Sequence, residues 1–191
     1  METMFSMFLA AVLINNIVLS KFLGMCPFLG VSKKMSSAIG MGCAVIFVIF
    51  GASVFTYGLY YLVLEPNGLE YMKLITFILV IASFVQFTEM IIKKFSPSLY
   101  KSLGIYLPLI TTNCAVLYVA LENISAQFNF GEMVVNSIAV PTGFLLVLVI
   151  FASIRERLEE SNPPLAFRGN PLALVTAAIM ALAFTAFAGL V

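Results

Sequence analysis

Two of the three cysteines have the residue type and the setting to bind a metal centre. Cys26 stands between Gly24 and Pro27, and Cys114 directly follows Asn113, in each case inside an apolar stretch that helix-disrupting residues interrupt. Thiolates are soft ligands for copper, zinc and iron–sulfur clusters. Two thiols cannot complete a four-ligand site, so a metal or redox centre at these positions requires ligands from a partner.

An alternative remains open for each thiol, because most isolated cysteines in apolar segments are small buried packing residues. Cys43 fits that alternative, since it lies among small residues in a regular helical pattern, and we expect it to be buried. If Cys26 and Cys114 are ligands, iron is favoured over zinc, because a membrane site with two such cysteines in each protein suits electron transfer. The chain has no histidine, which excludes histidine-ligated haem.

A few other polar residues fall within apolar segments. Asn15 and Asn16 lie mid-segment, where they form hydrogen bonds between helices or line an ion or electron path. Glu89 is the only acid in a predicted span that is not its first residue, and an intramembrane carboxylate is a functional candidate unless it reaches the interface. Lys21 either extends to the interface or holds negative charge near the thiolates. Asn113, Asn15, Asn16 and Glu89 are therefore candidates for ion coupling.

The composition identifies an integral membrane protein. Of 191 residues, 62% are apolar and 10% are charged, and the mean hydropathy is +1.08. A soluble domain carries about 25% charged residues, so this chain has too little polar surface to cover a water-soluble globule. No glycine-rich nucleotide-binding motif is present, so nucleotide or flavin chemistry must occur elsewhere, and we expect the lipid bilayer and no nucleic acid as a partner.

Six apolar segments are long enough to cross a hydrocarbon core of about 30 Å. They span residues 4–31, 36–64, 70–92, 99–121, 132–154 and 171–190, and short polar connections separate them, including one over residues 122–125. The sequence therefore predicts an all-α fold with six transmembrane helices in a single membrane domain, residues 1–191. Three spans per half imply two inverted three-helix repeats, about 1–95 and 96–191.

The first and fourth predicted spans are expected to be broken. The first runs about 28 residues, which is about 42 Å as one helix and too long for a single upright span. Gly24, Pro27 and Gly30 predict a half-helix, a turn around Cys26 and a second short helix. In the fourth span, Gly104 and Pro108 are followed by Thr111-Thr112-Asn113, whose side chains can bond backbone groups that a broken helix frees.

Basic residues are concentrated on one side of the predicted membrane. The first, third and fifth connections with their flanks contain eight basic residues, whereas the opposite side contains only Lys73; the eight are Lys33, Lys34, Lys93, Lys94, Lys101, Arg155, Arg157 and Arg168. This bias predicts that those connections are cytoplasmic and that both termini lie outside, in the periplasm of a bacterial inner membrane. Residues 155–160 are expected to form a solvated helix end, with a docking surface for a partner as the alternative.

Several motifs together resemble a known family, the A subunits of the Rnf electron-transport complex. The sequence is similar also to the paralogous E subunits of the sodium-pumping NADH:quinone reductase. The matching stretches cover nearly the whole chain: residues 14–34, which include Asn15-Asn16 and Gly24-Met25-Cys26-Pro27, then 85–90, 103–116, 154–158 and 167–170.

The resemblance implies a component of an ion-translocating ferredoxin:NAD+ oxidoreductase, a translocase of bacterial or archaeal cell membranes, with no complete active site on this chain. It implies a homologous six-helix partner of opposite orientation (RnfE-like), beside B-, C-, D- and G-like subunits of the complex. The two homologues would share one [2Fe–2S] cluster, to which this chain gives Cys26 and Cys114. The cluster would relay electrons, coupled to Na+ or H+ transport.

A competing class is a transporter or channel protein without a redox role. In that case the broken helices would bind a substrate through Asn113, Thr111 and Thr112.

Overall fold

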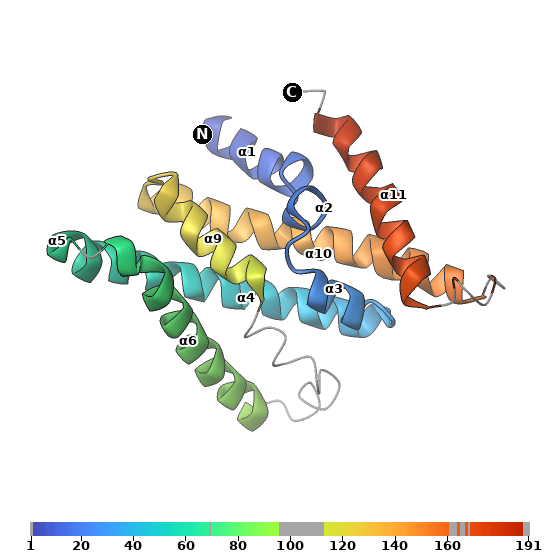
Figure 1. Ribbon diagram of the computed structural model, residues 1–191, viewed down its shortest axis with the longest axis horizontal. Coiled ribbons are helices and arrows are strands. Elements are labelled where there is room, and N and C mark those ends of the chain that lie inside the picture. Colours follow the sequence, from blue (N-terminus) through green and yellow to red (C-terminus); the bar gives the residue numbers. More distant parts are fainter. Residues whose placement is uncertain are drawn as a thin grey trace.

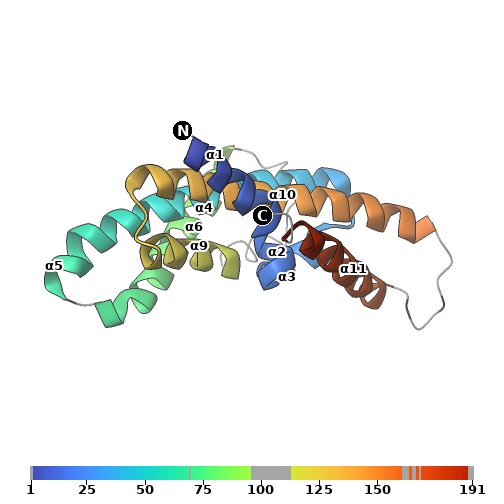
Figure 2. The same cartoon turned by 90° about the horizontal axis from the view of Figure 1, so that it is seen from above.

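The computed structural model describes residues 2–68, 70–95, 113–160, 164, 167 and 169–188. All regular elements in this part of the chain are helices. At the centre, α4 (Met35–Leu59) and α10 (Phe130–Glu160) lie antiparallel and side by side (Figure 1). Seen from above, α9 (Cys114–Ser125) lies towards the start of α10 and α11 (Asn170–Ala188) towards its end, with α2 (Ile17–Lys21) and α3 (Met25–Val31) between them (Figure 2).

Among the described residues, three apolar helical segments are long enough to cross a membrane: Met35–Asn67, Glu70–Ile91 and Phe130–Leu158. Shorter apolar helices cover Met4–Ile14, Cys114–Ser125 and Asn170–Ala186. The first long segment continues from α4 through a π-helix, η2 (Tyr60–Leu64), into α5 (Glu65–Asn67); the second comprises η3 (Glu70–Met72) and α6 (Lys73–Phe95). The chain is an all-α membrane protein, and the count of six spans stays a prediction.

The first apolar segment is broken twice, and neither break is at Pro27. α1 (Glu2–Leu9) continues as a π-helix, η1 (Ala10–Ile14), and the helix stops at Asn15. After α2, two residues adopt left-handed backbone conformations, Phe22 at φ 54° and Gly24 at φ 78°. Pro27 is the third residue of α3, where its missing N–H costs nothing because first-turn donors have no intrahelical partner.

The second predicted break is described only from Asn113 onward, and Gly104, Pro108, Thr111 and Thr112 lie outside the described residues. Asn113 is the N-cap of α9, and its side-chain oxygen accepts a hydrogen bond from the Ala115 N–H. The predicted connection over residues 122–125 is wrong, because these residues complete α9.

The first broken segment packs against α10 at a glycine. The side-chain nitrogen of Asn16 donates to the backbone carbonyl of Gly143 at 2.9 Å. A Cβ at position 143 would lie 2.9 Å from the Val12 carbonyl oxygen and 3.0 Å from that same Asn16 nitrogen. Only glycine permits this approach of two backbones. Nearby, the buried rings of Phe28 and Phe151 stack with centroids 4.3 Å apart and join α3 to α10.

The sequence predicted that Arg155 belongs to a solvated helix end, and this prediction is wrong. Arg155 is buried, and its guanidinium donates to the Leu29 carbonyl at 2.7 Å and to the Ser32 hydroxyl at 2.9 Å. A cation near the C-terminus of a helix is stabilised by the negative end of the helix dipole. Arg155 therefore anchors the end of α3 to α10, whereas its neighbours Glu156 and Arg157 are exposed.

Candidate functional site

Both candidate ligand cysteines lie in the first turn of a helix that begins at a break. Cys26 is the second residue of α3, and Cys114 is the first residue of α9. Both thiols are exposed, so both are accessible to a ligand or a partner. The backbone N–H groups of a first helical turn have no intrahelical acceptor, and the positive end of the α9 dipole lies at Cys114.

The structure brings the break at Phe22–Gly24 into contact with the break that precedes Cys114. The backbone N–H of Gly24 donates to the Sγ of Cys114 at 3.0 Å, across 90 residues of sequence. A Cβ at Gly24 would lie 3.1 Å from the ring of Phe144 and 3.4 Å from the Asn113 amide oxygen. The turn before Cys26 thus lies directly against the start of α9. Its geometry depends on a glycine with a positive φ and little room beside it.

Two asparagines at breaks in apolar segments, Asn16 and Asn113, are both helix caps. Asn16 caps α2, and its side-chain nitrogen donates to the carbonyls of Val12 at 3.1 Å and Gly143 at 2.9 Å. Asn113 caps α9, is only 4% exposed, and has a side-chain nitrogen with no hydrogen-bond partner in the described structure. Asn16 therefore has a full set of structural bonds, which fits helix packing, whereas Asn113 retains a free donor beside Cys114.

The remaining cysteine does not join this region. Cys43 is exposed on α4, and the expectation that it is buried is wrong. Within the described ranges, no group of three or more His, Cys, Asp or Glu side chains could hold a metal ion. A metal centre at Cys26 and Cys114 would need further ligands from outside these residues. The two thiols suit half of such a site, because they are soft donors at adjoining helix starts.

A polar cavity of about 140 Å³ lies beside the first break. Ala10 and Ala11 of η1 form part of one wall, and five polar side chains also line the cavity: Asn15, Lys21, Tyr118, Glu122 and Asn136. The Tyr118 hydroxyl donates to the Glu122 carboxylate at 2.6 Å and accepts a hydrogen bond from the Lys21 ammonium. The Lys21 nitrogen lies 3.7 Å from Glu122 and 4.2 Å from the centre of the Tyr118 ring. Lys21 thus pairs with a carboxylate and not with a thiolate.

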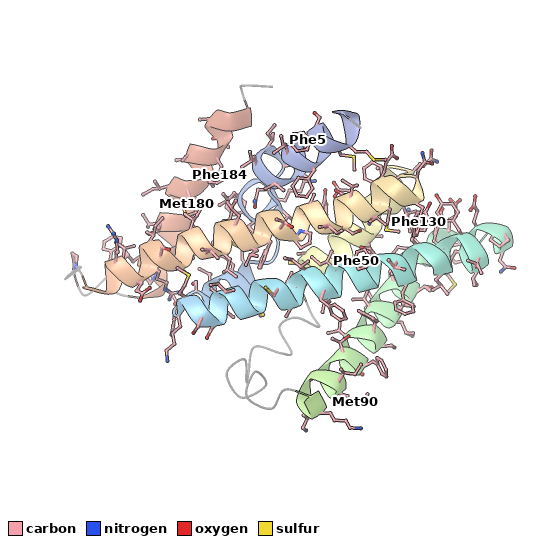
Figure 3. The ribbon with its side chains drawn as sticks, turned by 180° about the vertical axis from the view of Figure 1, so that it is seen from behind. Phe5, Phe50, Met90, Phe130, Met180 and Phe184 are labelled. Atoms are coloured by element: carbon pink, nitrogen blue, oxygen red, sulfur yellow. The ribbon has the colours of Figure 1, made fainter. Side chains whose placement is uncertain are left out.

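The other candidates for ion coupling are separated by the fold. Asn15 is exposed at the end of η1 and lines the cavity. Glu89 is half-buried near the end of α6 and does not line it. Its neighbour Met90 lies at the end of α6 that projects away from α4 and α10 (Figure 3). The part that Glu89 was predicted to play in ion coupling stays a prediction.

Sequence reasoning missed Tyr118, Glu122 and Asn136. The sequence predicts a connection at Glu122, whereas Glu122 lies on α9 in helical register with Cys114. Cys114, Tyr118 and Glu122 follow one another at intervals of four residues, which places them along one side of α9. A polar residue at each step of that spacing in an apolar helix is the signal for Tyr118 and Glu122, whereas Asn136 lies on α10 and has no such signal.

Comparison with known proteins agrees with this architecture. The family model described as "Rnf-Nqr subunit, membrane protein" matches residues 4–191. The chain is 55% identical to the A subunit of the Na(+)-translocating ferredoxin:NAD(+) oxidoreductase complex of Acetobacterium woodii, over 98% of each chain. It is 56% identical to the A subunit of the ion-translocating oxidoreductase complex of Cronobacter sakazakii, over 97% of this chain and 96% of the relative. The corresponding protein of Syntrophotalea carbinolica is 54% identical over 100% of this chain and 99% of its own length. The chain therefore belongs to the Rnf-Nqr family of membrane-protein subunits.

Proposed function

We propose that this chain is a membrane-spanning component of an ion-translocating oxidoreductase complex. The names of its relatives support this role, since the proteins that match it over nearly their whole length are A subunits of such complexes. No complete catalytic centre is proposed for the chain itself. Its contribution is to carry electrons within the bilayer.

The proposed electron carrier is a [2Fe–2S] cluster, held by Cys26 and Cys114 together with two thiolates of a homologous partner protein. The observation that carries this proposal is the contact between the two breaks, in which the Gly24 N–H donates to the Cys114 Sγ at 3.0 Å. Such a cluster, when bound, takes up and releases one electron.

The residues of this chain would hold and tune the site. Cys26 and Cys114 would supply two sulfur ligands from two adjoining helix starts. The Gly24 N–H would stabilise negative charge on the Cys114 sulfur, and hydrogen bonds to ligand sulfurs raise the reduction potential of a cluster. Asn113 would offer its free amide N–H to the same negative region, since that donor has no other partner in the described structure.

The orientation and the partner belong to the same proposal. The distribution of basic residues supports cytoplasmic positions for the first, third and fifth connections and outer positions for both termini. The partner would be a homologue of opposite orientation, whose own thiols face Cys26 and Cys114. The resulting centre would lie between the two chains, within the bilayer.

The test is co-expression of this chain with its homologous partner and purification of the pair in detergent. We expect a coloured complex with visible absorption from iron–sulfur charge transfer, and equal amounts of iron and acid-labile sulfide. A colourless pair without iron would contradict the proposal and favour a transporter without a redox role.

Matched variants locate the ligands. Cys26→Ser and Cys114→Ser should each abolish the visible absorption and the bound iron, while the pair still copurifies. Cys43→Ser is the control, because Cys43 is also exposed but lies on α4. Loss of iron in Cys43→Ser, with iron retained in the other two variants, would overturn the ligand assignment.

A further inference from the structure

The polar cavity beside η1 offers a small cation a charge-balanced site. It encloses about 140 Å³, which is room for an ion together with water. Its ionisable groups are one carboxylate, one ammonium and one phenol, from Glu122, Lys21 and Tyr118. A single carboxylate balances one positive charge, and at present the tethered ammonium of Lys21 supplies that charge at 3.7 Å.

Besides these groups, the amide side chains of Asn15 and Asn136 line the cavity, and its other lining residues are apolar. Asn136 is nearly buried, and its side-chain nitrogen donates to Asn123 at 2.8 Å. Of the two polar atoms of the Asn136 side chain, only the oxygen can ligate a cation. Asn123 in turn donates to the hydroxyl of Ser137 at 3.1 Å, so the orientation of this amide chain is fixed. Hard oxygen ligands of this kind bind alkali and alkaline-earth cations rather than soft metals.

The wall formed by η1 adds a favourable field. The continuous helix α1–η1 ends at Asn15, whose N–H reaches back to the Ala10 carbonyl at 2.8 Å. The last carbonyls of a helix lack intrahelical N–H partners and lie at the negative end of its dipole. Ala11 belongs to this last turn and lines the cavity beside Ala10, so this end of the helix borders the cavity. Single π-turns of this kind occur often at functional sites.

From these features we propose that the cavity is an exchange site for one alkali cation, which binds at the Glu122 carboxylate when the Lys21 ammonium withdraws. The Lys21 side chain is 41% exposed and that of Glu122 is 32% exposed, so the flexible lysine has space to leave. Exchange of one monovalent cation for another keeps the carboxylate neutralised at each stage, which avoids an uncompensated charge in an apolar bundle.

The site lies on the same two segments as the proposed redox centre. Lys21 is three residues before Gly24, and Glu122 is two helical turns after Cys114 on α9. The inference that binding here contributes to ion transport therefore rests on the proposed function. Binding of the cation itself does not.

The test uses the purified complex that contains this chain, with Na+ as the probe and K+ as the balancing ion. Binding of ²²Na+ is measured without ferredoxin, and ferredoxin:NAD+ activity is measured against Na+ concentration. Glu122→Gln should weaken Na+ binding and raise the Na+ concentration for half-maximal activity by about tenfold or more, because a charged ligand is lost. Lys21→Met should tighten binding by up to about fivefold, because the competing ammonium is gone. The expected shifts are opposite in sign.

Glu132→Gln is the matched control. Glu132 is half-buried, does not line the cavity, and accepts the Asn129 N–H at 3.0 Å, a bond that glutamine can retain. Wild-type ²²Na+ binding in both cavity variants, or shifts in the same direction, would overturn the inference. If Glu122→Gln fails to assemble, Lys21→Met alone decides, since unchanged binding in that variant also overturns it. Iron content is measured in parallel. If the wild-type complex lacks iron while the two variants still show these shifts in Na+ binding, the redox proposal is refuted and the cation site is retained.

Discussion

Asn16 and Asn113 both cap a helix that begins inside an apolar segment, but their remaining amide atoms are used differently. The Asn16 nitrogen donates to Val12 at 3.1 Å and to Gly143 at 2.9 Å, so it joins three segments of chain. The Asn113 nitrogen is buried without a partner in the part of the chain that the structure describes. The first asparagine therefore stabilises the fold, whereas the second retains hydrogen-bonding capacity next to a candidate ligand.

The largest expected effect tests the Asn16 bonds from the α10 side. Gly143→Ala places a methyl group 2.9 Å from the Val12 carbonyl oxygen, which is backbone and cannot rotate away. The two segments must separate, so the free energy of unfolding should fall by about 3 kcal/mol. Unfolding of the purified chain by SDS in mixed micelles measures this change. The control is Gly58→Ala, where a Cβ would meet nothing within 4 Å.

The next effect removes the Asn16 donors and keeps its cap. In Asn16→Ser, the hydroxyl still accepts from the start of α2, but the carbonyls of Val12 and Gly143 lose their bonds. We expect a loss of about 2 kcal/mol in the same unfolding assay, at about 1 kcal/mol for each lost bond. A variant as stable as the wild type would remove the contrast between the two asparagines.

A smaller effect concerns the turn that contacts Cys114. Gly24 has φ 78°, so alanine there must adopt a left-handed conformation that costs about 1–2 kcal/mol. Gly24→Ala should therefore destabilise the chain by about 1.5 kcal/mol. It should also displace the N–H that bonds Cys114, which changes the rate of maleimide labelling at that thiol. Labelling of Cys43 in the same sample provides the internal reference. Unchanged stability and unchanged labelling together would contradict the role assigned to Gly24.

The smallest effect is expected at Asn113. Asn113→Ser keeps the cap on α9 and removes only a nitrogen that makes no described bond, so its stability should change by less than about 0.5 kcal/mol. Asn16→Ser is the matched comparison. If Asn113→Ser destabilised the chain as much as Asn16→Ser does, the amide nitrogen of Asn113 would have a structural partner after all.

Much of the helical framework could be predicted from the sequence because it depends on local hydropathy. The long apolar runs predicted spans close to those of α4, α6, α10 and α11. The position of the first break was less predictable. Pro27 is compatible with a first helical turn, so the break falls at Asn15–Asn16 and at Phe22–Gly24 instead.

The polar cavity could not be predicted, because its parts meet only through tertiary packing. Lys21 and Glu122 are 101 residues apart, and nothing in local sequence pairs them. The position of Arg155 could not be predicted either. It stands in a charged stretch typical of a surface helix end, but it donates hydrogen bonds to the end of α3. The two cysteine positions were predictable as candidates, since residue type and helix-disrupting neighbours identify them without knowledge of packing.

The double attachment of α3 has a mechanical consequence. Seven residues are too few to form a stable helix alone, so α3 takes its direction from what holds it. Its first end adjoins α9 through Gly24, its middle residue Phe28 stacks on Phe151, and its last turn bonds Arg155, the last two residues being on α10. A rotation of α10 relative to α9 would therefore change the orientation of α3 and move Cys26 relative to Cys114.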